Sequence, residues 1–145
     1  MVIFDTNVLI SAALISGSRG DACVRGTLLR RVPLVFSAAT FAELEEVLMR
    51  AKFDRYIPRR SREAILSVWR DAAFFVPSTV IREPVADCSD VSDNKFLELA
   101  LATEAIVIVT GDPDLLVLDP WRGIRIVGLR EFDSVFPLSD DRVED

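Results

Sequence analysis

Short apolar runs alternate with amphipathic stretches along the chain, and this alternation predicts strands followed by helices. The clearest strand is Ile106–Val109, because four β-branched residues in a row suit a strand that is covered on both faces. Four further apolar runs predict strands elsewhere. They are Val2–Phe4, Leu34–Phe36, Phe74–Val76 and Ile124–Val127. Strands separated by helices indicate an α/β protein with a parallel sheet.

The amphipathic stretches between the strands predict helices. The expected ranges are 7–15, 20–31, 37–51, 61–73, 92–104 and 129–136, and a short apolar helix follows a turn at 111–114. The segment 77–91 is expected to be extended. A chain of 145 residues without internal repeats fits one domain. We place that domain at residues 1–136 and expect an acidic tail at 137–145.

Acidic residues follow the strands at positions where a ligand site is common. Asp5 ends the first strand, Asp112 and Asp114 follow Ile106–Val109, and Asp93 lies in the first turn of the helix before that strand. In an open α/β sheet, the carboxyl ends of the strands line the crevice where ligands bind. Asp5 and Asp112 therefore share one sheet edge if their two strands are parallel neighbours.

The helix after the second strand adds one more candidate, Glu43. The apolar residues of this helix define its expected buried stripe: Phe41, Leu44, Val47, Leu48 and Ala51. Glu43 and Glu45 both lie on the borders of the stripe, so periodicity alone leaves the choice between them open. Position favours Glu43, because it is nearer the carboxyl end of the strand.

Each acid also fits an ordinary structural role. Asp5 can cap the helix that follows it, and Glu43 can complete a capping box with Thr40. Asp93 can complement a helix dipole, and the two acids of the turn at 111–114 are common turn residues. Several carboxylates at one sheet edge repel one another, however, and such a cluster persists when a hard divalent cation lies among them. Taken jointly, the acids favour a metal site.

The composition excludes several kinds of catalytic site. The chain has no histidine, so a Ser-His-Asp triad, a Cys-His dyad and a histidine-bound zinc site are ruled out. Catalysis must depend on carboxylates, hydroxyls, amines, thiols or a bound metal. Two cysteines are too few for a disulfide framework or a Cys-only zinc site. We expect reduced thiols, with Cys23 buried in a helix and Cys88 more exposed in a loop.

Charge and hydropathy restrict the partners and the cellular compartment that the sequence predicts. The chain has 17 Lys and Arg residues against 23 Asp and Glu residues, a net charge of −6, which argues against a generally basic nucleic-acid binder. No apolar run approaches the roughly 18 residues that a membrane span needs. The first residues lack the basic start of a signal peptide. We therefore expect a cytoplasmic protein without membrane contact.

Four segments carry a resemblance to the PIN-domain ribonucleases. They are 2–8 (VIFDTNV), 37–48 (SAATFAELEEVL), 87–101 (DCSDVSDNKFLELAL) and 106–116 (IVIVTGDPDLL). Their order and spacing agree over about residues 1–136, and they most resemble the toxins of bacterial toxin–antitoxin pairs. The resemblance implies an α/β fold, a three-layer α/β/α sandwich with a central, mostly parallel twisted sheet.

The same resemblance implies a metal-dependent endoribonuclease that hydrolyses RNA with one or two Mg²⁺ or Mn²⁺ ions. Asp5, Glu43, Asp93 and Asp112 match the four acidic catalytic positions, and Asp5, Asp93 and Asp112 are the expected metal ligands, with Asp5 and Asp112 the first candidates for direct binding. Supporting positions match at Asn7, Asp90, Thr110 and Asp114. The implied partners are an RNA substrate, a protein antitoxin and a second copy of the chain in a homodimer.

Positive charge is concentrated in one segment. Between Arg50 and Arg70, seven cationic residues face two acidic ones, a local excess of five positive charges. Such a patch can follow a phosphate backbone, bind an acidic antitoxin segment, or be an ordinary solvated helix face. The residues expected to bind RNA or a partner are Arg50, Lys52, Arg59, Arg60 and Arg62.

Two other functions remain open on sequence grounds. One is a phosphatase in which Asp5 attacks phosphorus, although Asn7 stands where that mechanism needs a general acid. The other is a PIN-like module that binds RNA or a partner without cutting. Activity on purified RNA separates these readings from the ribonuclease.

Overall fold

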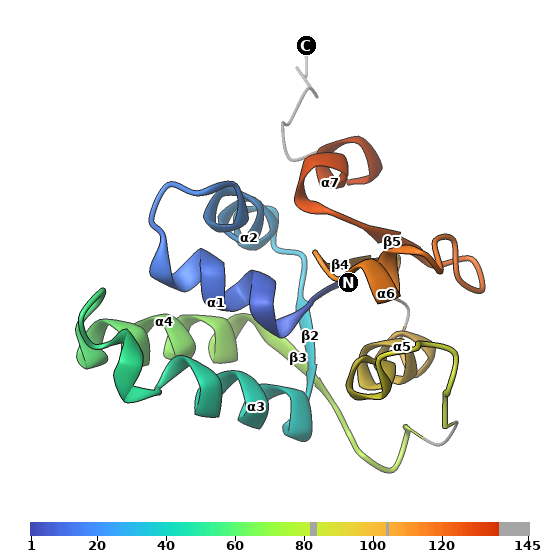
Figure 1. Ribbon diagram of the computed structural model, residues 1–145, viewed down its shortest axis with the longest axis horizontal. Helices are drawn as coiled ribbons and strands as arrows, with labels where there is room; N and C mark the ends of the chain where they lie inside the picture. Colours follow the sequence, from blue (N-terminus) through green and yellow to red (C-terminus); the bar gives the residue numbers. More distant parts are fainter. Residues whose placement is uncertain (82–83, 104, 137–145) are drawn as a thin grey trace.

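The computed structural model describes residues 1–81, 84–103 and 105–136 (Figure 1). Five strands form one sheet in the order β3-β2-β1-β4-β5, and every neighbouring pair is parallel. The strands are β1 (Val2–Phe4), β2 (Leu34–Ser37), β3 (Ala73–Val76), β4 (Val107–Val109) and β5 (Arg125–Val127). The predicted α/β class and parallel sheet are confirmed. The predicted acidic tail at 137–145 lies outside the described residues.

The helices fall close to the predicted ranges. They are α1 (Thr6–Leu14), α2 (Arg19–Leu29), α3 (Ala38–Leu48), α4 (Arg59–Ala72), α5 (Asn94–Leu101), α6 (Pro113–Leu116) and α7 (Leu129–Val135). Short 3₁₀ turns occur at η1 (Ala51–Phe53) and η2 (Val91–Asp93). Asp93 therefore lies in the turn before α5 and not inside that helix. Over the described residues, no helix is long and apolar enough to span a bilayer.

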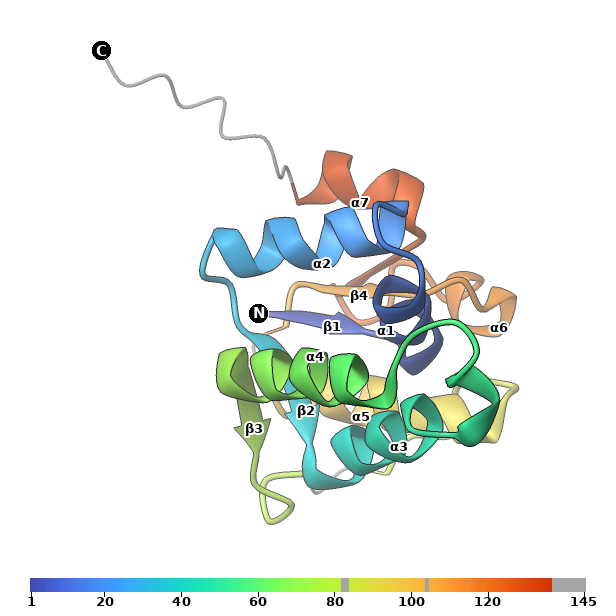
Figure 2. The ribbon, with the colours of Figure 1, turned by 90° about the vertical axis from the view of Figure 1, so that its left-hand side faces the viewer.

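Helices cover both faces of the sheet, which confirms the three-layer sandwich (Figures 1 and 2). Alternate side chains of each strand point to opposite faces. Phe4 belongs to the core that α1, α2, α3, α4 and α7 also line, and its ring centroid lies 5.7 Å from that of Phe132 in an edge-on arrangement. Ile3 points the other way and packs with Leu97 of α5 and Leu115 of α6. The central strands β1, β2 and β4 are buried on both faces, which explains why their sequences are almost continuously apolar.

The strand order places a crevice at the carboxyl ends of β1 and β4. From β1 the chain continues outward through β2 and β3, and it returns to pair β4 with the other side of β1. The segments after β1 and β4 turn to opposite faces, since α1 and α6 belong to different cores. A sheet opens a ligand crevice where its strand order reverses in this way. Asp5 and Asp112 therefore share one edge, as their positions predicted.

Two local predictions are wrong for identifiable reasons. The capping box of α3 is formed by Ser37 and Thr40, which exchange side-chain and backbone hydrogen bonds. Glu43 takes no part in it, so its carboxylate is available elsewhere. Cys88 is buried, with 3% of its surface exposed, because its loop folds inward and its amide N–H donates to the Asn94 side chain at 2.8 Å. Cys23 is buried as predicted.

Candidate metal site

Asp5 and Thr110 connect the ends of the two central strands. Asp5 follows β1, is 4% exposed, and accepts the Asn7 amide N–H at 2.9 Å as the N-cap of α1. Its other carboxylate oxygen accepts the Thr110 hydroxyl at 2.6 Å. Thr110 follows β4, is fully buried, and accepts the Asp112 amide N–H at 3.0 Å. One hydroxyl thus fixes both the Asp5 carboxylate and the backbone that carries Asp112.

Asp112 caps the short helix α6. Its carboxylate accepts the Asp114 amide N–H at 2.9 Å, and Pro113 occupies the first helical position, where an N–H is not needed. Asp114 is exposed. The sequence predicted only a turn role for Asp112; the structure makes it a helix cap, and this role fixes its side-chain direction.

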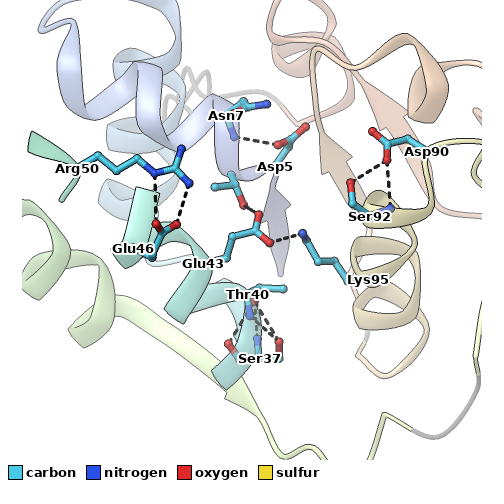
Figure 3. Close-up of polar contacts among 11 residues, drawn as sticks. Asp5, Asn7, Ser37, Thr40, Glu43, Glu46, Arg50, Asp90, Ser92 and Lys95 are labelled. Carbon is cyan, nitrogen blue, oxygen red and sulfur yellow. Dashed lines mark hydrogen bonds and ion pairs between the residues drawn. The ribbon is translucent and has the colours of Figure 1, made fainter. Parts of the chain in front are cut away.

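Three carboxylates converge beside these strand ends. One oxygen atom from each of Asp90, Asp93 and Asp112 lies within 4.8 Å of the other two. Asp90 caps η2 by accepting the Ser92 amide and hydroxyl (Figure 3). The buried side chain of Asn94 accepts the Cys88 amide N–H, which holds the loop in place. The structure thus brings Asp90, expected only to support the site, into the compact trio, while Asp5 lies beside it.

Asp93 has the most perturbed environment of these acids. It is 8% exposed, and its Oδ2 atom has no hydrogen-bond partner in the described part of the chain. Burial, then the hydrogen bond and charge of Asp112, and then the charges of Asp90 and Asp5 raise the pKa of Asp93 to about 7. The same hydrogen bond lowers the pKa of Asp112. A proton on Asp93 therefore offsets part of the repulsion among the acids near neutral pH.

Glu43 lies on the other side of the crevice and is neutralised by Lys95. Figure 3 shows the two side chains meeting from α3 and α5. Lys95 forms an ion pair with Glu43 Oε2, and the Thr6 hydroxyl donates to Glu43 Oε1 at 3.1 Å. Lys95 and Thr6 were missed from the sequence. One signal was present: a cation in the first turn of a helix opposes the helix dipole, so a nearby anion is expected.

The trio fits a hard divalent cation. All its donors are carboxylate oxygens, which Mg²⁺ and Mn²⁺ prefer. Asp93 adds a buried oxygen that no protein group satisfies, and such an atom costs free energy unless a ligand reaches it. Over the described residues, no Lys or Arg forms an ion pair with Asp90, Asp93 or Asp112. The charge of these acids is therefore left for a cation to balance.

Arg62 does not belong to the predicted surface patch. It is 0% exposed, and its guanidinium donates to the carbonyls of Leu48 at 2.8 Å and Arg50 at 3.1 Å. It also forms an ion pair with Asp54. The last carbonyls of a helix lack partners within the helix, and Arg62 satisfies those at the end of α3. Its charge is therefore balanced by partners inside the fold and is not available to an RNA or protein partner at the surface.

The remaining patch is smaller than the sequence suggested. Arg50 pairs with Glu46 at 3.0 Å and Arg59 pairs with Glu63 at 3.5 Å. Lys52 and Arg60 are exposed, and neither forms an ion pair with another described residue. Of the five predicted residues, these two keep positive charge available to a partner, together with the exposed Arg55 between them in the sequence. They lie on the turn between α3 and α4 and at the start of α4.

Comparison with known proteins identifies one similarity. A family model described as PIN domain matches residues 1–114. The matched region includes the strands β1 to β4 and all the acids of the crevice. No curated protein and no solved structure is found to match the chain.

Proposed function

The chain belongs to the PIN-domain family, and we propose that it is an endoribonuclease that hydrolyses RNA phosphodiester bonds with bound Mg²⁺ or Mn²⁺. PIN domains are generally nucleases that use divalent metals. The observation that carries the proposal is Asp93, whose buried carboxylate has an oxygen without a partner and faces Asp90 and Asp112. This arrangement occurs at the crevice where an α/β sheet binds its ligands.

Asp93 and Asp112 would hold the ion, with Asp90 or Asp5 as a further ligand. The ion supplies the Lewis-acid chemistry of phosphodiester hydrolysis. Thr110 holds the Asp5 carboxylate and the Asp112 backbone in fixed positions through its two hydrogen bonds. These bonds restrict the directions from which both acids can bind an ion.

We assign proton transfer to Glu43. Water adds to the phosphorus atom and the bond from phosphorus to the leaving sugar oxygen breaks. Glu43 accepts the proton that the water loses, and the leaving oxygen takes up a proton from solvent. Glu43 is suited to this role because its side chain is 37% exposed and is oriented by Thr6 and Lys95. A carboxylate can act as the general base here, so this hydrolysis does not require a histidine.

Cleavage of RNA by the purified protein is expected to require Mg²⁺ or Mn²⁺ and to stop in chelator. Asp5→Asn and Asp112→Asn should each lower the rate by at least about 100-fold, because even groups that only orient metal ligands contribute 10- to 100-fold. Asp71→Asn, at an exposed acid of α4, is the matched control and should cleave like the wild type. Metal-independent cleavage, or full activity in both site variants, would show that the proposed function is wrong.

We also propose that the enzyme is the toxin of a toxin–antitoxin pair, with a protein antitoxin as partner and a homodimer as its assembled form. The resemblance of its four segments to such toxins supports this role. An apolar groove of about 480 Å³ between α1, α2 and α4, lined by residues such as Val24, Ile65 and Val68, offers a surface for a partner. Co-purification with a small product of a neighbouring gene distinguishes this role from general RNA processing.

Lys52 and Arg60 are proposed to bind the RNA backbone. The double variant Lys52→Glu/Arg60→Glu should bind RNA more weakly and with a salt dependence shallower by about 1.4 in log–log slope, since each lost phosphate contact on a single strand accounts for about 0.7. Arg130→Glu on α7 is the control and should leave the slope unchanged. An unchanged slope in the double variant removes this segment from the RNA-binding surface.

A further inference from the structure

The acids of the crevice divide into two halves with different charge balance. Asp90, Asp93 and Asp112 form no ion pair with a described cation, and Asp93 keeps an unpartnered, buried oxygen. Glu43, on the other half, already has a cation and a hydroxyl on its two oxygens. The first half lacks a positive charge, and the second half already contains one.

Lys95 is brought to this second half by its position on α5. It is the second residue of α5, whose apolar side chains pack in the core between the sheet and α6. Its side chain is 30% exposed, and its Nζ atom lies 5.3 Å from the centre of the Phe96 ring. The dipole of α5 disfavours a cation at this end of the helix, so the ion pair with Glu43 is what balances Lys95 there.

We propose that the Lys95 ammonium takes the place of a second cation, so that this site holds a single divalent ion among Asp90, Asp93 and Asp112. The inference rests on the proposed function. In two-metal nucleases, a pair of ions clamps the reacting phosphate from both sides. Here a second ion that used Glu43 as a ligand would meet the positive charge of Lys95 on the same carboxylate. A lysine ammonium is a compact point charge, and it supplies the positive charge on that side of the phosphate.

Counting bound Mn²⁺ tests this inference without measuring cleavage. Isothermal titration calorimetry of the wild type should give one Mn²⁺ per chain, and the electron paramagnetic resonance spectrum should lack the coupling of an ion pair. Lys95→Met should bind a second Mn²⁺ at least about 10-fold more tightly than any second ion on the wild type. That gain should disappear in Lys95→Met/Glu43→Gln, while Lys95→Arg, which keeps the charge, should still bind one ion.

The outcomes distinguish failure of this inference from failure of the function on which it rests. A wild type that binds no Mn²⁺ overturns both. The role of Lys95 is wrong if the wild type binds two ions, or if a folded Lys95→Met variant still binds only one. Neither result contradicts the proposed metal-dependent ribonuclease. Circular dichroism of each variant establishes that it is folded, and Lys95→Arg provides a second variant that retains the length and charge of the side chain.

Discussion

The Asp93→Asn variant is expected to be more stable than the wild type in the absence of metal and to lose RNA cleavage by at least about 100-fold. The carboxylate is 8% exposed and faces two other acids, which raises its pKa to about 7. Asparagine has nearly the same shape as a protonated aspartate and carries no charge. The substitution therefore removes the repulsion and also removes a metal ligand.

The stability gain should depend on pH in a defined direction. The pKa of Asp93 is near 7 in the folded chain and near its ordinary value of 3.8 in the unfolded chain. Between these two pH values the folded protein binds more protons than the unfolded one, so wild-type stability falls as the pH rises from about 4 to 7. Asparagine is insensitive to this titration. We expect the variant to exceed the wild type by about 4 kcal/mol at pH 8 and by less than about 1 kcal/mol near pH 4.

Urea unfolding at pH 4 and pH 8, each in chelator, measures this difference. Adding Mn²⁺ at pH 8 should stabilise the wild type more than the variant, because only a folded chain with an intact site gains free energy from the ion. Asp71→Asn should change the unfolding free energy by less than about 0.5 kcal/mol. A variant that is less stable at pH 8, or a gain that does not change with pH, contradicts the electrostatic account of Asp93.

The shared sheet edge of Asp5 and Asp112 is a part of the site that could be predicted from the sequence alone. Strands alternating with helices indicated a parallel sheet, and the rule for carboxyl ends then placed both acids at one edge. That inference needed only the pairing of β1 with β4, which the structure has. The capping role of Asp5 was also predicted, because it lies directly before a helix. Asp112 was expected only as a turn residue, and the structure shows that it caps α6.

Other parts of the site depend on contacts that leave no local pattern. Asp90 joins the trio because η2 and the buried Asn94 side chain turn its loop inward. Lys95 and Glu43 are 52 residues apart and meet only because α3 and α5 flank the same crevice. Neither arrangement follows from periodicity, since the period of a helix fixes which residues share a face and not which distant residue meets them.

The burial of Arg62 could have been predicted from its spacing in the sequence, but the local count of charges favoured a surface position. Arg62 lies four residues before Leu66 and seven before Trp69, and all three are buried on one face of α4. That spacing marks the inner stripe of a helix. The local charge excess instead suggested a surface role, because a charge count carries no information about which face a residue occupies.

Replacing Arg62 with methionine is expected to lower the free energy of unfolding by about 3 kcal/mol, because two carbonyls at the end of α3 lose their donor. Methionine fills part of the volume but leaves the Leu48 and Arg50 carbonyls without their donor. A buried polar group without a partner costs about 1–3 kcal/mol. Urea unfolding of the two proteins at one pH measures the loss.

Asp54→Asn separates the buried carbonyl contacts of Arg62 from its ion pair. The Asp54 side chain is 53% exposed, so losing its charge should cost less than about 1 kcal/mol, as for other exposed pairs. Large destabilisation in Arg62→Met with little in Asp54→Asn assigns the free energy to the carbonyls at the end of α3. If Arg62→Met instead unfolds like the wild type and only weakens RNA binding, Arg62 acts at the surface and its buried role is wrong.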